Sequence, residues 1–420
     1  MSPGGAGTLG GRTFLFLQGA ATPFHRRLAL ALEGEGARIA KVQFCGGDVL
    51  FWRRPATPFR GGIADWPQAL GQVLAAQAVT DVVLFGDCRP HHAVAVAEAR
   101  RRGLRLHLFE EGYLRPGWIT CESWGVNGHS DLPQHPAEIL ALAQALPAPA
   151  EALPVPAPFL NRAAWDVLWT AGLMALAPLY PCYRHHALDH PLVEYAGWVT
   201  RFVTAPVTVR RARRLMRRLA DAAGHYYLHP LQLDTDFQIR AHSPYGSTMD
   251  AAREVIASFA RYADCAARLV VKLHPLDVRP TRKRRAVAAM AAEHRVADRV
   301  DFIDGGDLDQ LVDDARGVVV VNSTVGMMAL GHGRPVKVLG TAVFDVAGLT
   351  FQDGLDRFWA DAAPPQPALL DAFLRVVVAR TQIPGGFFSR AGLDLAVAGA
   401  CRRIVEDRVR PLAVRIGAAG

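Results

Sequence analysis

Two adjacent carboxylates, Glu110 and Glu111, follow a strand-like apolar run at 104–109 and precede a glycine. In open α/β sheets, ligands bind at the carboxyl ends of the strands, so a reacting group is expected at such a position. Successive side chains of an extended segment point to opposite sides, and both carboxylates therefore cannot face one site. We expect one of them to act as an acid or base in a cleft, and the other to be structural or orienting.

A second set of polar residues follows two further strand-like runs, at 267–273 and 317–321. An imidazole can donate to a phosphate oxygen, and hydroxyls with backbone N–H groups at a helix start can bind a phosphate. Each motif also fits an ordinary helix cap or a rigid turn. Together they predict a site for the phosphate of a donor substrate, with no metal and no cofactor. Its members are Lys272, His274, Pro275, Asn322, Ser323 and Thr324.

A second acidic site, Asp234 and Asp236, lies with Gln232 in the loop after the strand expected at 225–229. An Asp-x-Asp pair can chelate Mg²⁺. One of the two carboxylates could instead be a nucleophile opposite Glu110 or Glu111. A nucleophile and an acid/base across a cleft are what a double-displacement glycosyl transfer with retention requires.

The elements that would position these residues alternate between apolar runs and amphipathic segments. Residues 1–135 predict a doubly wound parallel sheet, and residues 220–385 predict a second Rossmann-like domain. The expected fold is α/β and GT-B-like, with two parallel sheets facing across a cleft. The expected domains are 1–150, a linker and helical insert at 151–219, 220–385, and C-terminal helices at 386–420 that are candidates to pack back on the first domain.

The insert contains an apolar segment and a basic segment. The uncharged part of 165–183 is shorter than the ~20 residues of a spanning helix, so a buried or interfacial helix is expected. The run that follows predicts a cationic amphipathic helix on anionic lipid, although a solvated helix face or an RNA-contacting arm fits the pattern equally. Its cations are Arg210, Arg211, Arg213, Arg214, Arg217 and Arg218.

Composition narrows the class of protein. The chain has 420 residues and a net charge of +8, which suits nucleic acid, acidic membranes or anionic substrates as partners. The six cysteines are far apart in the sequence, which argues against a zinc site and a disulfide framework and favours a reducing cytoplasm. The N-terminus has no pattern of a signal peptide.

Seven motifs in order give the chain a resemblance to the KpsS/LipB capsular polysaccharide family over residues 13–385. That family is similar to KpsC and, more distantly, to GT-B sialyltransferases. The motifs are Phe16-Leu-Gln-Gly-x-x-x-Pro-Phe24, Phe44-x-Gly-Gly-Asp48, Leu84-Phe-Gly-Asp-Cys-Arg-Pro90, Phe109-Glu-Glu-Gly-Tyr-Leu-Arg-Pro116, Pro230-Leu-Gln-Leu-Asp-Thr-Asp-Phe-Gln-Ile-Arg240, Lys272-x-His-Pro275 and Val321-Asn-Ser-Thr-Val-Gly326.

The resemblance implies a retaining β-Kdo transferase that uses CMP-Kdo and places the sugar acid on lysophosphatidylglycerol. His274, Ser323 and Thr324 would hold the donor, Glu111 is favoured over Glu110 as acid/base, and Asp236 over Asp234 as nucleophile. The substrate and loop residues carried by the motifs are Gln18, Gly19, Asp87, Arg89, Arg115 and Gln232.

The same resemblance implies a cytoplasmic protein, peripheral on the inner face of the inner membrane of a Gram-negative bacterium. The anionic membrane surface is then an expected partner, other capsule assembly proteins are candidate partners, and nucleic acid is not. Two rival functions remain open at this stage. They are a capsule export or assembly factor without catalysis, and a nucleic-acid-binding protein that uses the arginine run.

Overall fold

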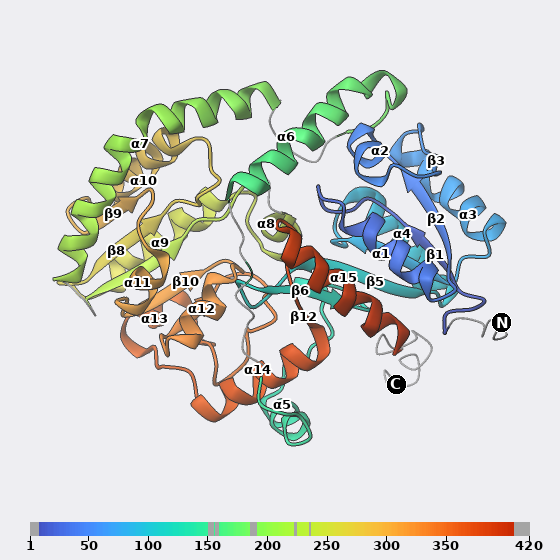
Figure 1. Ribbon diagram of the computed structural model, residues 1–420. Coiled ribbons are helices and arrows are strands. Elements are labelled where there is room, and N and C mark those ends of the chain that lie inside the picture. The colour runs from blue at the N-terminus through green and yellow to red at the C-terminus, as the bar shows by residue number, and fades with distance from the viewer. Residues whose placement is uncertain are drawn as a thin grey trace. The chain divides into compact units, whose positions relative to one another are not determined.

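The computed structural model describes residues 8–149, 155, 159–184, 191–221, 225–234 and 237–406 (Figure 1). The chain divides into two compact units. The first contains residues 1–131, 150–186 and 377–420, and the second contains 132–149 and 187–376.

The first unit is built on a seven-stranded sheet in the order β12-β6-β5-β4-β1-β2-β3. Its elements are β1 (Thr13–Phe16), α1 (Phe24–Gly34), β2 (Arg38–Gln43), α2 (Gly46–Trp52), β3 (Thr57–Pro58), η1 (Ile63–Asp65), α3 (Trp66–Ala76), β4 (Asp81–Phe85), α4 (Pro90–Arg102), β5 (Arg105–Glu111), β6 (Trp118–Glu122), η2 (Asn127–His129), α6 (Phe159–Ala175), η3 (Ala177–Leu179), β12 (Gln382–Pro384) and α15 (Arg390–Val405).

Both faces of this sheet are buried, which explains the continuous apolar strands. Phe14 and Phe16 of β1 pack on one face with Phe24 of α1 and with the inner side of α15. Leu15 and Leu17 point to the other face, into a cluster that contains residues of α3 and α4. This alternation is the expected behaviour of a parallel strand covered on both sides.

The first sheet, predicted to be parallel, has an antiparallel edge. β6 runs antiparallel to β5, and β12, from near the C-terminus, runs antiparallel to β6. The pairing of Glu110 with Thr120 and of Glu111 with Ile119 continues the ladder, so β5 extends through both glutamates instead of ending at Phe109. The Gly-Gly-Asp of the motif at 44–48 forms the first turn of α2.

The second unit contains a five-stranded, all-parallel sheet in the order β11-β10-β7-β8-β9. Its elements are α5 (Pro136–Ala143), α7 (Pro191–Ala220), β7 (Tyr226–Pro230), α8 (Phe237–His242), α9 (Thr248–Tyr262), β8 (Arg268–Lys272), α10 (Pro280–Glu293), β9 (Val300–Ile303), α11 (Leu308–Asp313), β10 (Gly317–Val320), α12 (Val325–Gly331), β11 (Val336–Val338) and α13 (Leu355–Asp361). α14 (Pro367–Thr381) crosses from this unit into the first.

Helix α9 shows why these segments fold as they do. Its N-cap Ser247 accepts a hydrogen bond from the backbone N–H of Asp250, and Val255, Ile256 and Phe259 are fully buried against the sheet. The α/β class with two mainly parallel sheets, predicted from the sequence, is confirmed. Within the described part of the chain, no helix is long and apolar enough to cross a membrane.

Candidate functional site

The carboxyl edge of the first sheet gathers residues from three neighbouring strands. Gln18 and Gly19 follow β1, Asp87 and Arg89 follow β4, and Glu110 lies near the end of β5. Because β5, β4 and β1 are adjacent and parallel, their carboxyl ends meet at the same edge. The structure thus brings these sequence-predicted residues together within one unit.

Hydrogen bonds fix the polar groups after β1. The guanidinium of Arg89 donates to Oε1 of Gln18 at 3.0 Å and to the carbonyl of Gly19 at 3.4 Å. The amide nitrogen of Gln18 donates to the hydroxyl of Tyr183 at 3.0 Å. Tyr183 was not predicted, since nothing near it in the sequence resembles a motif.

Asp87 connects the end of β4 to a later part of the chain. Its buried carboxylate accepts from the backbone N–H of Val126 at 3.2 Å and lies 3.0 Å from Nδ1 of His129. It therefore holds the segment that leads into η2 against the end of β4. This arrangement supports the site without requiring Asp87 to react.

Glu110 and Glu111 lie in different surroundings, as strand alternation predicts. The carboxylate of Glu111 lies between two guanidinium groups, 3.1 Å from Nη1 of Arg115 and 3.0 Å from Nη2 of Arg162 on α6. Glu110 lies over Gly86, where a Cβ would be 3.2 Å from its Oε2. Two charge-assisted contacts hold the carboxylate of Glu111, which suits an orienting group.

A buried network that sequence reasoning missed lies beside this pair. The hydroxyl of Tyr113 donates to Oε1 of Glu122 at 2.5 Å, and Ser130 donates to Oε2. The backbone N–H of Asn127 donates to the Tyr113 hydroxyl at 2.6 Å. Burial raises the pKa of Glu122 to about 8 and also raises that of Tyr113. The network fixes the loop that follows the two glutamates.

In the second unit, the carboxyl ends of β7, β8 and β10 meet at one edge of the sheet. Gln232 follows β7 and Asn322 follows β10, and the two are joined by two hydrogen bonds. Nε2 of Gln232 donates to Oδ1 of Asn322 at 2.9 Å, and the backbone N–H of Asn322 donates to Oε1 of Gln232 at 3.3 Å. These two hydrogen bonds connect motifs that are 90 residues apart in the sequence.

Lys272 and His274 come from the strand on the other side of β7. Burial lowers the pKa of Lys272, while Asp304 raises it and Arg201 lowers it further. Nδ1 of His274 accepts the backbone N–H of Leu276 at 3.2 Å, which places the proton of the neutral ring on Nε2. Both residues can therefore donate to an anion, and the exposed Pro275 shapes the turn.

Ser323 and Thr324 lead into α12. The hydroxyl oxygen of Ser323 accepts the backbone N–H of Val325 at 3.3 Å. Thr324 is the N-cap residue, but it has helical backbone angles and its side chain makes no capping hydrogen bond. Of the two hydroxyls, only that of Ser323 has a capping contact in this turn.

The acidic loop after β7 is only partly described. Asp234 accepts the backbone N–H of Thr248 at 3.2 Å and pairs with Lys283 at 3.1 Å. Lys283 also pairs with Asp277 at 2.8 Å. Asp234 is thus held at the start of α9, whereas Asp236 lies outside the described residues. The basic run Arg210–Arg218 forms the last part of α7.

Comparisons with known proteins place the chain among capsule proteins. A family model described as "Capsule polysaccharide biosynthesis protein" matches residues 80–388. "Capsule polysaccharide export protein KpsS" of Escherichia coli is 33% identical over 386 residues, which cover 90% of this chain and 98% of that protein. "Capsule polysaccharide modification protein LipB" of Neisseria meningitidis serogroup A is 30% identical over 386 residues, with 90% and 91% coverage. A solved structure, "Thermosulfurimonas dismutans KpsC, beta Kdo 2,7 transferase", aligns over 94% of this chain and 99% of that chain, at 13% identity and a TM-score of 0.45.

Proposed function

Because the chain belongs to the capsule polysaccharide biosynthesis protein family, we propose that it is a retaining β-Kdo glycosyltransferase. It would move Kdo from CMP-Kdo to a lysophosphatidylglycerol acceptor and so start the poly-Kdo linker of a capsule. The observation that carries the proposal is the gathering of the polar motifs at the carboxyl edges of two parallel sheets, which are the ligand-binding edges of such folds.

The second unit is proposed to hold the donor. A buried lysine gains from a nearby negative charge, because an anion favours the protonated form that burial disfavours. The phosphate of CMP would supply that charge beside Lys272. The Nε2–H of His274 and the paired amides of Gln232 and Asn322 would add directional hydrogen bonds. We propose that this donor binding needs no metal.

The chemistry requires a nucleophile and an acid/base. A carboxylate of the acidic loop would attack the anomeric carbon while the bond from that carbon to the CMP phosphate breaks. The acceptor hydroxyl would then displace the carboxylate and give its proton to the acid/base. Asp236 is proposed as nucleophile, because both oxygens of Asp234 have structural contacts.

We propose Glu110 as the acid/base, in the reverse of the order favoured in the sequence. Glu111 lies between Arg115 and Arg162, so it is suited to orient the loop or the acceptor. Glu110 lies at the same edge as Gln18 and Asp87.

The test is CMP release from CMP-Kdo, generated in situ, with and without lysophosphatidylglycerol. We expect acceptor-dependent release and a Kdo-bearing lipid by mass spectrometry. Glu110→Gln and Asp236→Asn should each lower turnover by about 100-fold or more. Glu111→Gln and Asp234→Asn are the matched controls and should retain more activity. Equal loss in Glu110→Gln and Glu111→Gln would contradict the assignment of the acid/base.

A second candidate function is a capsule export or assembly factor without catalysis. It is favoured by the name of the Escherichia coli relative, which is called an export protein. A well-folded protein that releases no CMP with any acceptor, and whose Glu110→Gln variant still supports capsule formation in cells, would establish this alternative.

A further inference from the structure

Helix α7 has one face packed on the second unit. A Cβ on Gly197 would lie 2.6 Å from Cβ of Val278, so the helix backbone approaches the loop after β8 closely. Ala212 and Leu219, further along the helix, are buried. These residues share one side of the helix, which leaves the other side to solvent.

Two arginines hold the helix in place. Arg201 donates to the carbonyl of Asp277 at 2.6 Å and pairs with Asp304 at 3.0 Å. Arg218 pairs with Asp301 at the other end. The side chains of these two arginines are therefore committed to contacts inside the unit.

The solvent side of the first half of α7 is apolar. Val199, Phe202, Val203 and Val207 are between 59% and 74% exposed, and they share this side by helical spacing. A helix that is already packed on one face does not need a second apolar stripe for folding. Such a stripe, next to a cationic one, is the pattern of a helix that lies in a membrane interface.

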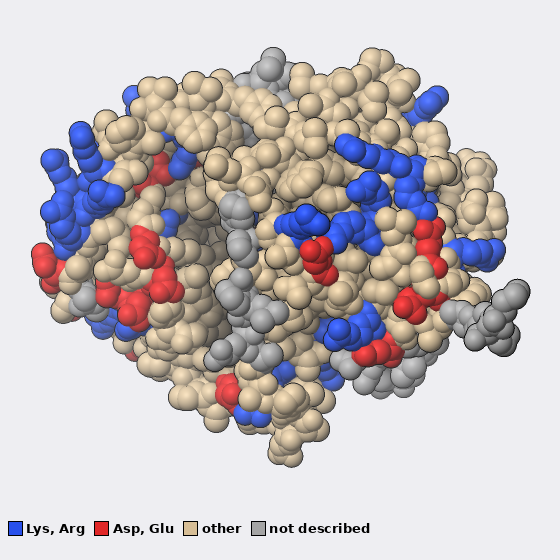
Figure 2. Space-filling model, viewed as in Figure 1, with Lys and Arg blue, Asp and Glu red and all other residues tan. Residues whose placement is uncertain are grey.

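The same side becomes basic in the second half of the helix. Arg210, Arg213, Arg214 and Arg217 continue the stripe, and Figure 2 shows Lys and Arg side chains gathered at the left over this part of α7. Within the described ranges, no carboxylate pairs with Arg210, Arg213 or Arg214. Like charges at this spacing repel one another, and an anionic partner would relieve that repulsion.

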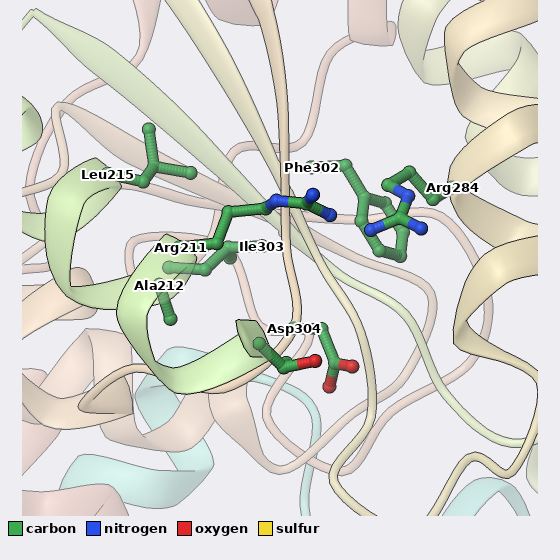
Figure 3. Close-up of a pocket in the computed structure, with 8 residues that line it drawn as sticks. Arg211, Ala212, Leu215, Arg284, Phe302, Ile303 and Asp304 are labelled. Carbon is green, nitrogen blue, oxygen red and sulfur yellow. The ribbon is translucent and has the colours of Figure 1, made fainter. Parts of the chain in front are cut away.

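A small pocket lies between α7 and α10, beside this stripe (Figure 3). Arg211 reaches into it from α7 and Arg284 from α10, and the other lining residues include Leu215, Phe302, Ile303 and Asp304. In the part of the chain that the structure covers, neither guanidinium has an ion-pair partner. The carboxylate of Asp304 is already paired with Arg201 at 3.0 Å, so two guanidinium groups beside apolar side chains suit a phosphate that carries an apolar substituent.

We propose that this face of α7 docks the protein on an anionic phospholipid bilayer. The apolar stripe enters the boundary between headgroups and acyl chains, and the basic stripe meets the lipid phosphates. Arg211 and Arg284 hold the phosphate of one lipid. The positive charge of the second half of α7 indicates an anionic partner. The exposed apolar side chains of the first half favour a bilayer over a soluble polyanion. None of its residues is among the proposed catalytic groups, and its role would not depend on which sugar the protein transfers.

The experiment is cosedimentation with vesicles of phosphatidylcholine alone and of phosphatidylcholine mixed with phosphatidylglycerol. Wild type should bind the mixed vesicles and not the neutral ones. Arg211→Gln/Arg284→Gln should weaken this binding by about 30-fold, which is about 1 kcal/mol for each arginine near the surface. Arg253→Gln/Arg357→Gln is the matched control, because it removes the same charge from exposed positions of α9 and α13. It should retain the affinity of wild type.

A further variant tests the apolar stripe. Phe202→Ser/Val203→Ser should weaken binding to mixed vesicles at high salt as well as at low salt, since burial of apolar area is not screened. Turnover on a soluble acceptor analogue should be unchanged in all of these variants. That readout separates failure of the docking surface from failure of the proposed transferase activity.

Several results would overturn the proposal. Equal binding to neutral and mixed vesicles would remove the role of the arginines, and so would equal loss in the control variant. If the Arg211/Arg284 variant loses binding of inorganic phosphate but keeps vesicle affinity, the pocket is a site for a soluble anion. If the variants lower binding of a single-stranded RNA and leave vesicle affinity intact, the surface is a nucleic-acid site.

Discussion

Replacing Glu122 with glutamine should remove a pH dependence from the stability of the protein. Glu122 is buried at the end of β6, and its carboxylate oxygens accept hydrogen bonds from Tyr113 and Ser130. A carboxamide has the same shape as the protonated carboxyl group. It can keep both contacts because each hydroxyl can donate or accept. The substitution therefore changes the charge and leaves the packing.

The size of this effect on the free energy of unfolding follows from the pKa of Glu122. Burial raises the pKa of Glu122 from 4.5 to about 8. Between these values the folded protein keeps a proton that the unfolded chain releases, so the free energy of unfolding falls as pH rises. The slope is about 1.4 kcal/mol for each pH unit. Over two pH units within this window, wild type should lose about 3 kcal/mol that Glu122→Gln does not lose.

The assay is urea denaturation at several pH values between 5 and 8. The difference in free energy of unfolding between variant and wild type is plotted against pH. Glu254→Gln is the matched control, since Glu254 also accepts a tyrosine hydroxyl, that of Tyr245 at 2.8 Å, but at the surface. Its difference from wild type should not change with pH. If the difference in free energy of unfolding between Glu122→Gln and wild type is also independent of pH, the carboxyl group is not protonated in the folded protein.

Two further predictions concern the site edges. Gly86→Ala should lower turnover and cost about 1–2 kcal/mol of stability, because Gly86 has φ +68° and the added Cβ would lie 3.2 Å from Oε2 of Glu110. Activity and Tm are measured together, and full activity would show that Glu110 does not need this position. Gln232→Ala should weaken CMP binding about tenfold in calorimetry, because it removes the hydrogen bonds of Gln232 to the backbone N–H and to the side-chain amide of Asn322. Unchanged affinity would exclude the paired amides from the donor site.

Much of the architecture could be predicted from the sequence. The strands at 13–16, 81–85, 268–272 and 317–320 all correspond to short apolar runs that end in polar residues. Such runs are diagnostic when both faces of a sheet are covered, as the clusters around Phe16 and Leu15 show. The family predicted from the motifs is confirmed.

The edge of the first sheet could not be predicted. β12 has three residues and pairs with a strand more than 250 residues earlier, so neither its length nor its neighbours in sequence give a signal. The continuation of β5 through Glu111 depends on this antiparallel edge, because β6 supplies the partners of both glutamates. The position of β12 cannot be inferred from a local pattern, because its partner β6 is distant in the sequence.

The candidate residues were easier to find than their roles. Polar motifs after apolar runs indicate the carboxyl edge, and the structure brings Gln232 to Asn322 and Arg89 to Gln18 as that rule predicts. Which residues are structural depends on partners from elsewhere in the chain. Arg162 and Lys283 lie in helices whose sequences carry no motif, yet they provide contacts to Glu111 and Asp234.

The two adjacent glutamates show how one strand can provide two different carboxylates. Alternation turns Glu111 toward the guanidinium groups of Arg115 and Arg162, and turns Glu110 over Gly86. The two guanidinium groups hold the Glu111 carboxylate in place, so its position depends on a helix that is distant in the sequence. The role of each glutamate is therefore set by the groups that face it across the two sides of β5, and not by the motif that the two share.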